Sequence, residues 1–342
     1  MLLTAHHRGD EAETVLYKWF RGAGTRGLAA MPAVRPFAGG MLARPFLDLP
    51  RESLRQYASE HGLNWIEDPA NERLDFDRNF IRHRLMPLVM ARWPAAEGNI
   101  RRASINAADS LQVLERAAAL DIAAATISGA FNPLSKAPVL DAGTLRDLPL
   151  ENCFNAVRHW VNAAGYAAPP RRRIAYLRST LVEPEERPSG CFAFDGVEIR
   201  RYRHALYLLE GVARIERQAV AWSPDRALPI PGTPIELVAI ETEGTGLARR
   251  HLDGRALTVD WTTTDRTLRV VAGGPRKSLR KLFQELGVPP FIRRALPRIS
   301  AAGAVLCVPG VADNVDYRAE RGEPGVRFRL RYVGVSRGDS GQ

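Results

Sequence analysis

Apolar residues recur every three or four positions in three stretches near the start of the chain. This spacing places them on one face of a helix and predicts amphipathic helices over residues 10–21, 51–62 and 78–94. The leucines at positions 2 and 3 have the pattern of a buried strand end. A strand followed by helices indicates an α/β domain over residues 1–99. The side chains expected to face its core are Val15, Leu16, Trp19, Phe20, Leu54, Tyr57, Ala58, Ile81, Leu85, Leu88 and Val89.

A second region, residues 100–211, begins with a long helix and has another helical stretch at 151–165. Its last part alternates apolar and polar residues over 196–211, which predicts a β-hairpin. We therefore expect a mainly helical middle domain. The side chains expected to point inward are Leu111, Leu114, Ala118, Ile122, Phe154, Val157, Trp160 and Val161.

The pattern changes again in the C-terminal third. Residues 212–234 hold four prolines and no clear period, so we expect a linker there. Residues 235–334 mix short strands with one helix over 278–287, which predicts a small α+β domain. The tail, residues 336–342, is expected to be disordered. The side chains expected to bury one face of the helix are Leu279, Leu282, Phe283 and Leu286.

The net charge of +10 is concentrated near the C-terminus. From Thr245 to the end of the chain there are 18 Arg or Lys and 9 Asp or Glu. Such an excess is typical of nucleic-acid-binding modules. A general preference of this chain for arginine is the alternative, since it has only four lysines.

Composition narrows the class of protein. No apolar run approaches the roughly 20 residues of a membrane span, and no signal peptide is visible. Cys153, Cys191 and Cys307 are scattered and odd in number, which argues against a disulfide framework and against a cysteine-bound metal. We expect a soluble cytoplasmic protein with no membrane association and no metal-ligand set of its own.

The first candidate site is the stretch around His6, Asp10 and Glu13. It follows the predicted strand, and ligands of open α/β sheets bind just beyond the carboxyl ends of strands. Asp10 and Glu13 are three apart and share one face of the first helical turn. Two carboxylates there suit an ammonium group or a metal-bound nucleotide. The alternative is structural, because Asp with Glu three residues later is also a capping pair.

Two further candidates are basic. Arg78 and Arg82 are four apart on one helix face and could clamp a phosphate; the alternative is a solvated basic face. A second cluster surrounds the start of the predicted C-terminal helix, where cations and a helix N-terminus favour an anion. The alternative there is a solubilising face. The residues of this cluster are Arg276, Lys277, Arg280 and Lys281.

Three segments of the chain resemble one family in the same order. Residues 4–31 resemble the HHxxDxxET segment of the tRNA(Ile)-lysidine synthetases. Residues 44–87 resemble that family's continuation, including its RNxxR element at 78–82. Residues 277–297 are similar to its C-terminal domain.

The resemblance implies a ligase of the PP-loop ATP-pyrophosphatase superfamily. The fold it implies is a Rossmann-like (adenine nucleotide alpha hydrolase-like) α/β N-terminal domain, then a middle domain that positions tRNA, then a basic tRNA-binding domain. The activity it implies is ATP-dependent attachment of free L-lysine to the wobble cytidine of tRNA(Ile) with a CAU anticodon. ATP and Mg²⁺ serve this reaction, which passes through an adenylated cytidine and changes codon recognition from AUG to AUA.

Residue roles follow from the same resemblance. Asp10 and Glu13 would bind lysine, and His6 and Arg82 would lie beside the nucleotide or the adenylated base. An arginine there can offset phosphate charge as it develops. Arg78 and the cluster at 276–281 would bind tRNA. The resemblance leaves open whether the protein is a homodimer.

One family motif is missing from the printed sequence. Family members have a strand and an SGGxDS loop that cradles ATP phosphates with backbone N–H groups, and no such run occurs here. We expect a family member without its first hundred or so residues, through a start codon assigned inside the gene, so that the N-terminal domain is incomplete. We expect this chain to lack ATP-binding competence.

Two alternative functions stay open at this point. A non-catalytic tRNA-binding fragment would also lack the loop. A tRNA 2-thiolation enzyme of the same superfamily would need paired cysteines, and none of the three is paired in sequence.

Overall fold

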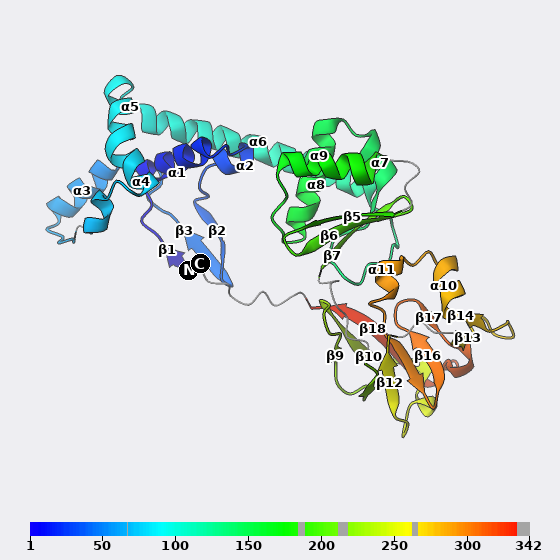
Figure 1. Cartoon of the computed structure of the whole chain (residues 1–342). Helices are drawn as coiled ribbons and strands as arrows, with labels where there is room; N and C mark the ends of the chain where they lie inside the picture. Colours follow the sequence, from blue (N-terminus) through cyan, green and yellow to red (C-terminus); the bar gives the residue numbers. More distant parts are fainter. Residues whose placement is uncertain (67, 184–188, 211–217, 262–265, 334–342) are drawn as a thin grey trace. The chain divides into compact units, whose positions relative to one another are not determined.

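The computed structural model describes residues 1–66, 68–183, 189–210, 218–261 and 266–333 (Figure 1). The chain divides into two compact units, Met1–Ala117 and Ala118–Gln342, and each is described by itself. The tail predicted to be disordered, and the first residues of the expected linker, lie outside the described residues.

The first unit combines a three-stranded sheet with helices. The sheet order is β1-β3-β2, with β1 parallel to β3 and β2 antiparallel to it. A 3₁₀ turn at Pro69–Glu72 and a π turn at Ile81–Leu85 interrupt the helical segments. The elements are β1 (Leu2–Leu3), α1 (Arg8–Phe20), α2 (Thr25–Leu28), β2 (Val34–Phe37), β3 (Gly40–Ala43), α3 (Arg51–Glu60), α4 (Asp77–Phe80), α5 (Met86–Arg92) and α6 (Ala96–Ala125), the last of which continues into the second unit.

The strand at the start of the chain is present, but the prediction that it is buried is wrong. Leu2 and Leu3 are 46% and 63% exposed. The two leucines are exposed because β1 is an edge strand, with β3 as its one partner among the described strands.

The core of the first unit is small. Ala12 and Leu16 of α1 pack against Ile81 and Met86. Trp19 and Phe20, which we expected to face the core, are more than 60% exposed and stack on each other at the end of α1. The buried stripe of α1 therefore ends one turn before the helix does.

The helix expected over residues 78–94 is one run of α4, the π turn and α5. Leu88 was expected to point inward but is 73% exposed, and Met86 is buried instead. A π turn contains one more residue than an α turn. The turn at Ile81–Leu85 therefore moves the buried face of the helix by one position.

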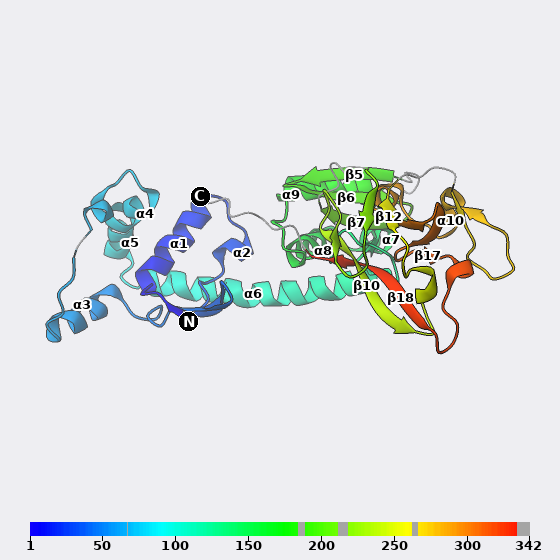
Figure 2. The same ribbon diagram turned by 90° about the horizontal axis from the view of Figure 1, so that it is seen from below.

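The first part of the second unit is a four-stranded sheet with helices on one face (Figures 1 and 2). The strand order is β4-β7-β6-β5, and α8 buries all four side chains that its sequence predicted. The predicted hairpin is confirmed as β6 and β7, whereas β5 was not anticipated. The elements are β4 (Leu140–Asp141), α7 (Ala142–Asp147), α8 (Leu150–Ala163), α9 (Arg171–Leu177), β5 (Ser189–Phe194), β6 (Val197–Tyr202) and β7 (Ala205–Glu210).

The last part of the second unit has two larger sheets and two short helices. The sheet orders are β11-β18-β10-β9 and β17-β16-β15-β12-β8. Its elements are β8 (Val220–Trp222), β9 (Leu228–Pro229), β10 (Ile235–Glu243), β11 (Leu247–Ala248), β12 (Leu257–Asp260), β13 (Thr267–Leu268), β14 (Lys277–Ser278), α10 (Leu279–Glu285), α11 (Pro290–Arg293), β15 (Arg298–Ala301), β16 (Ala304–Val308), β17 (Ala312–Asp313) and β18 (Pro324–Tyr332).

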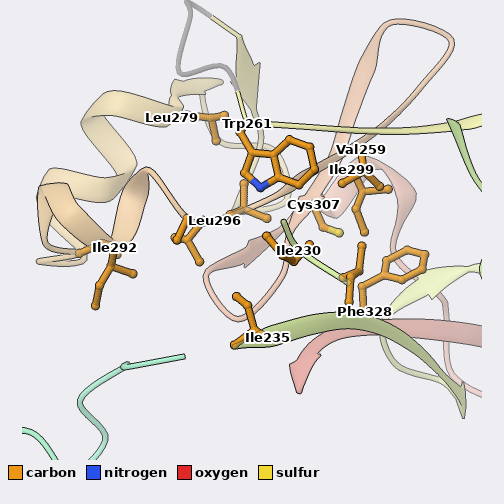
Figure 3. Close-up of a cluster of buried hydrophobic side chains, with 14 of the residues drawn as sticks. Ile230, Ile235, Val259, Trp261, Leu279, Ile292, Leu296, Ile299, Cys307 and Phe328 are labelled. Atoms are coloured by element: carbon orange, nitrogen blue, oxygen red, sulfur yellow. The ribbon is translucent and has the colours of Figure 1, made fainter. Parts of the chain in front are cut away.

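Side chains of both sheets and both helices meet in one core (Figure 3). Trp222 and Ile230 are buried in it, so the described part of the expected linker supplies strands and core residues. Leu279, Leu282 and Phe283 of α10 are buried as predicted. Leu286 is 54% exposed, contrary to prediction, because α10 ends at Glu285 and Leu286 is its C-cap.

Candidate active site

A cavity of about 650 Å³ lies in the first unit, beside the start of α1. All four residues expected to be catalytic line it, and so does Arg78. The loop between β1 and α1, α1 itself, the segment 26–44 and the α4–π turn run form its walls. The lining residues are His6, Asp10, Glu13, Thr14, Lys18, Arg26, Ala29, Ala30, Met31, Pro32, Arg35, Arg44, Arg78, Asn79 and Arg82.

The start of α1 is capped, but not by the pair that the sequence suggested. His7 is the N-cap, and its ring Nδ1 accepts a hydrogen bond from the Asp10 backbone N–H at 3.3 Å. Asp10 Oδ2 in turn accepts from the His7 backbone N–H at 2.9 Å. The capping box thus joins His7 and Asp10, and Glu13 has no part in it. Helix capping therefore does not explain why a glutamate stands at position 13.

Arg82 joins the two carboxylates across the cavity wall. Its Nε donates to Glu13 Oε1 at 2.7 Å, and its Nη2 donates to Glu13 Oε2 and to Asp10 Oδ1, both at 2.9 Å. The hydrogen bond that Arg82 donates to Glu13 raises the pKa of Arg82 above its ordinary value, against the opposing effect of burial. Two carboxylates and one guanidinium leave one negative charge, which suits an additional cation.

His6 lies in the loop between β1 and α1. Its Nδ1 is 2.9 Å from the Thr4 hydroxyl, a contact that holds the ring at the edge of the cavity. Asn79 belongs to the RNxxR element at residues 78–82. Its side chain donates hydrogen bonds to the carbonyls of Ala70 and Arg73 at 2.9 and 2.8 Å. Asn79 therefore fixes the preceding turn and, through it, the start of α4.

The cavity is also lined by cationic side chains that the sequence motifs did not predict. Lys18, Arg26, Arg35 and Arg44 line it together with Arg78 and Arg82. A usable signal was present, because two Arg-Pro-Phe triplets flank a Gly-Gly pair at residues 34–46. Glycine between extended segments favours a two-residue hairpin turn. In the structure that turn is centred on Ala38 and Gly39, and its register places Arg44 diagonally across from Arg35.

Glu11 was also missed as a site-forming residue. It is fully buried, and its Oε1 accepts from the Ser104 hydroxyl at 3.1 Å and from the Met31 backbone N–H at 3.2 Å. Arg101 forms an ion pair with its other oxygen, and the same guanidinium binds Asp48 at 2.6 Å. Glu11 thereby ties α1 to α6 and to the cavity segment at Met31.

The basic cluster expected at the C-terminal helix belongs to the second unit and not to this cavity. Arg276 pairs with Asp316 at 3.4 Å, and Lys277 pairs with Glu285 at 2.6 Å. Arg280 and Lys281 are exposed. The Ser278 hydroxyl accepts from the Lys281 backbone N–H, so a side chain already caps the helix. Two of the four cations therefore have a carboxylate partner, although Arg276 shares Asp316 with Arg269.

Three family models match the chain in order. They are a PP-loop domain over residues 1–89, a TilS substrate binding domain over 140–207 and a TilS substrate C-terminal domain over 257–330. A tRNA(Ile)-lysidine synthase of Methylococcus capsulatus is 35% identical over 311 residues, which span 91% of this chain and 69% of that protein. The chain belongs to the tRNA(Ile)-lysidine synthase family.

A second relative agrees with this assignment. A tRNA(Ile)-lysidine synthase of Coxiella burnetii is 31% identical and covers 90% of this chain and 67% of its own length. A crystal structure of a TilS C-terminal domain is matched with 16% identity and a TM-score of 0.30, over 35% of this chain and 99% of that one. The family resemblance is confirmed, and so is the fold class with its PP-loop, Rossmann-like N-terminal domain. The domain boundaries stay a prediction.

The arrangement in this lysidine synthase family member does not suit Mg²⁺ at the two predicted carboxylates. The Arg82 guanidinium already contacts Glu13 through both carboxylate oxygens and Asp10 through one. Among the described residues there is no group of three His, Cys, Asp or Glu that could hold a metal ion. In the part of the chain that the structure describes, no helix is both long and apolar enough to span a membrane.

Proposed function

We propose that this chain acts in lysidine formation, with the cavity beside α1 as the place where lysine and the wobble cytidine meet. The observation that carries the proposal is the pair Asp10 and Glu13, held by Arg82 on one wall of a cavity whose remaining charges are cationic. The family assignment supplies the reaction: ATP-dependent joining of free L-lysine to tRNA(Ile) with a CAU anticodon, which changes codon recognition from AUG to AUA.

The carboxylates would bind the lysine ammonium. All four of their oxygens already accept a hydrogen bond from Arg82 or from the His7 N–H. A carboxylate oxygen has a second acceptor site, so an ammonium can share these oxygens with Arg82. The excess of one negative charge favours such a cation beside these carboxylates.

Arg82 would act on the leaving group. In the proposed step the lysine amine forms a bond to C2 of the adenylated cytidine, the bond from C2 to the adenylate oxygen breaks, and the amine loses a proton. AMP leaves with the electron pair of that bond. A guanidinium beside the departing phosphate stabilises its charge. His6 would lie beside the base or the nucleotide.

ATP supplies the adenylate in this reaction. The cationic wall of the cavity suits phosphate groups, but the sequence contains no SGGxDS run. No step is assigned to Mg²⁺, because Arg82 contacts the carboxylates that could receive it.

The tRNA partner is proposed from the family and from the charge. Arg78 in the cavity, and Arg276, Lys277, Arg280 and Lys281 in the second unit, would contact its phosphates. We also propose a cytoplasmic location, where free tRNA and lysine are present. A homodimer is a further proposal that sedimentation of the purified chain would test.

Incorporation of radiolabelled lysine into a tRNA(Ile) transcript with a CAU anticodon tests the function. Label that enters this tRNA, requires ATP and is lost in Arg82→Gln supports lysidine formation by the chain as it stands. Without the SGGxDS run we expect neither label nor pyrophosphate release. Specific binding of this tRNA together with lysine, but without incorporation even when the chain is extended by an SGGxDS segment, would favour the alternative of a non-catalytic tRNA-binding protein.

The thiolation alternative has no support in the structure. Cys153 and Cys307 are buried in hydrophobic cores, and Cys191 is on β5; all three are free thiols. Burial raises the pKa of each thiol, most strongly that of Cys307, which opposes the thiolate form that sulfur transfer needs.

A further inference from the structure

Part of the cavity wall is a β-hairpin that carries two arginines, Arg35 and Arg44. β2 and β3 are joined by a turn in which Ala38 has a φ of 44° and Gly39 a φ of 74°. Positive φ at both central residues is typical of the two-residue hairpin turn that matches the strand twist. The turn sets the register, which pairs Arg35 with Leu42 and continues through a hydrogen bond from the Arg44 N–H to the Ala33 carbonyl at 2.8 Å.

This register puts Arg35 and Arg44 on the same face of the hairpin. Side chains two residues apart on a strand share a face, so Arg44 lies on the side of Leu42, and Arg35 is directly opposite Leu42. Leu42 is only 5% exposed and Arg44 is partly buried, whereas Arg35 is exposed at the open end of this face. Diagonal neighbours of this kind are about 7–8 Å apart at their Cα atoms, within reach of one ligand group.

The two guanidinium groups act on each other without a counter-ion. Burial and the neighbouring charge of Arg35 both lower the pKa of Arg44. Neither arginine has a carboxylate partner among the described residues, whereas Arg26 and Arg82 of the same cavity do. Arg44 donates to the Pro32 carbonyl at 2.9 Å through Nη1, while its buried Nε has no hydrogen-bond partner in the described structure.

Other contacts hold this arrangement in place. The Arg35 guanidinium lies 5.4 Å from the centre of the Phe37 ring. Both arginines line the cavity that Asp10 and Glu13 also line. The cavity therefore has two carboxylates, Asp10 and Glu13, on α1 and two arginines on the hairpin.

We propose that Arg35 and Arg44 form a phosphate-binding site on the hairpin wall of this cavity. A phosphate carries enough negative charge to relieve the repulsion between two guanidinium groups, and its oxygens match their paired donors. The phosphate belongs either to the nucleotide or to the backbone of the tRNA anticodon loop. The choice of these two sources rests on the proposed function, whereas phosphate binding itself does not.

The double variant Arg35→Gln/Arg44→Gln of the 342-residue chain tests this site. The matched control is Arg21→Gln/Arg92→Gln, which removes the same charge from exposed arginines that also stack on aromatic rings, those of Tyr17 and Trp93. The probes are AMP, followed by calorimetry, and an RNA hairpin with the CAU anticodon loop, followed by fluorescence anisotropy over a salt series.

We expect the cavity variant to bind at least one probe tenfold or more weakly than the control does. A loss confined to AMP assigns the site to the nucleotide. A loss confined to the RNA, with a log–log salt slope smaller by about 1.4, assigns it to two backbone phosphate contacts. Equal affinities in the two double variants, or a parent chain that binds neither probe, would overturn the proposal.

A second variant separates binding from misfolding. Arg35→Lys/Arg44→Lys keeps both charges and should retain most of the salt slope while losing the paired donors of the guanidinium groups. Thermal unfolding followed by circular dichroism should match the parent in all three variants. If the parent chain shows no specific binding of lysine or of tRNA(Ile) but the cavity variant still loses phosphate binding, the site stands and the proposed function falls.

Discussion

Arg82 holds both carboxylate oxygens of Glu13, with Nε 2.7 Å from Oε1 and Nη2 2.9 Å from Oε2. The two residues are 69 positions apart in the sequence and come from different helices. Glu13 is thus bound by a fixed cation before any substrate arrives. In the proposed reaction a lysine ammonium would share these oxygens, so we expect the affinity for lysine to depend on where Arg82 lies.

Glu13→Gln and Asp10→Asn should each raise the lysine concentration needed for half-maximal binding. Loss of a charge-assisted hydrogen bond costs about 1.5–3 kcal/mol, or roughly 10- to 150-fold. The effect of Glu13→Gln should be the larger, because this change also releases Arg82. Calorimetric lysine titration measures both, with Glu60→Gln on α3 as the control. Unchanged lysine affinity in both variants would leave Asp10 with only its capping role.

Glu11→Gln should destabilise the first unit strongly. It breaks a buried ion pair with Arg101, and removal of one partner of such a pair costs about 3–5 kcal/mol. Arg101 keeps Asp48, so we expect the lower end of this range. The control is Asp75→Asn, whose pair with Arg73 is exposed and should contribute about 0–1 kcal/mol. Urea unfolding of both variants measures the difference, and similar midpoints would refute the structural role of Glu11.

Stability should fall with rising pH through the titration of Glu97. Burial, and then the nearby charge of Glu52, raise the pKa of Glu97 above its ordinary 4.5, although His7 and Arg8 partly oppose them. The folded state then holds this proton more tightly than the unfolded state does, so the free energy of unfolding decreases as pH rises above about 4.5. Glu97→Gln should therefore melt at a higher temperature than the parent at pH 7.

The same melts at pH 3.5 provide the control for Glu97. Both proteins carry a neutral side chain there, so their melting temperatures should converge. A difference that stays constant from pH 3.5 to pH 8 would point to altered packing instead of titration.

In the C-terminal cluster, two of the four cations should carry most of the tRNA affinity. Arg276 and Lys277 are already paired with carboxylates, whereas Arg280 and Lys281 are exposed. Each phosphate contact contributes about 0.7–0.9 to the log–log salt slope. Arg280→Ala/Lys281→Ala should therefore lower the slope for any tRNA by about 1.4–1.8.

Arg276→Ala/Lys277→Ala is the matched control for that experiment. It should change the slope less, and the apolar face of α10 is untouched in both pairs, so thermal stability should hardly move. Binding to isoleucine tRNA and to an unrelated tRNA should weaken alike, because phosphate contacts carry no sequence information. Identical slopes in the parent and in both variants would leave the cluster as a solvated face.

Local sequence patterns predicted local structure well in this chain. The inward face of α8, the hairpin of β6 and β7 and the start of α10 follow from spacing alone, because each depends on neighbours in the sequence. The exposure of Leu88 could not be predicted, because one extra residue in a helical turn leaves the apolar period of the sequence almost unchanged while it rotates the buried face of the helix.

The candidate site was predicted only in part, for a similar physical reason. His6, Asp10, Glu13, Arg78 and Arg82 were expected from motifs, and the structure brings all five to one cavity. Asp10 caps the helix and also binds Arg82, whereas Glu13 binds Arg82 without capping the helix, and this division depends on a contact between distant segments. The position of Arg35 and Arg44 also depends on a contact between segments, the register of the hairpin, which the motifs in the sequence do not contain.

The π turn at Ile81–Leu85 has a consequence for how Arg82 is aimed. Ile81 and Met86 are both buried against α1, although residues five apart on a regular α-helix point about 140° away from each other. The wider turn brings these two anchors to the same side and leaves Arg82 between them, directed at α1. Deletion of one residue here would make a more regular helix with only one anchor in place. One irregular helical turn therefore fixes the direction of the Arg82 guanidinium.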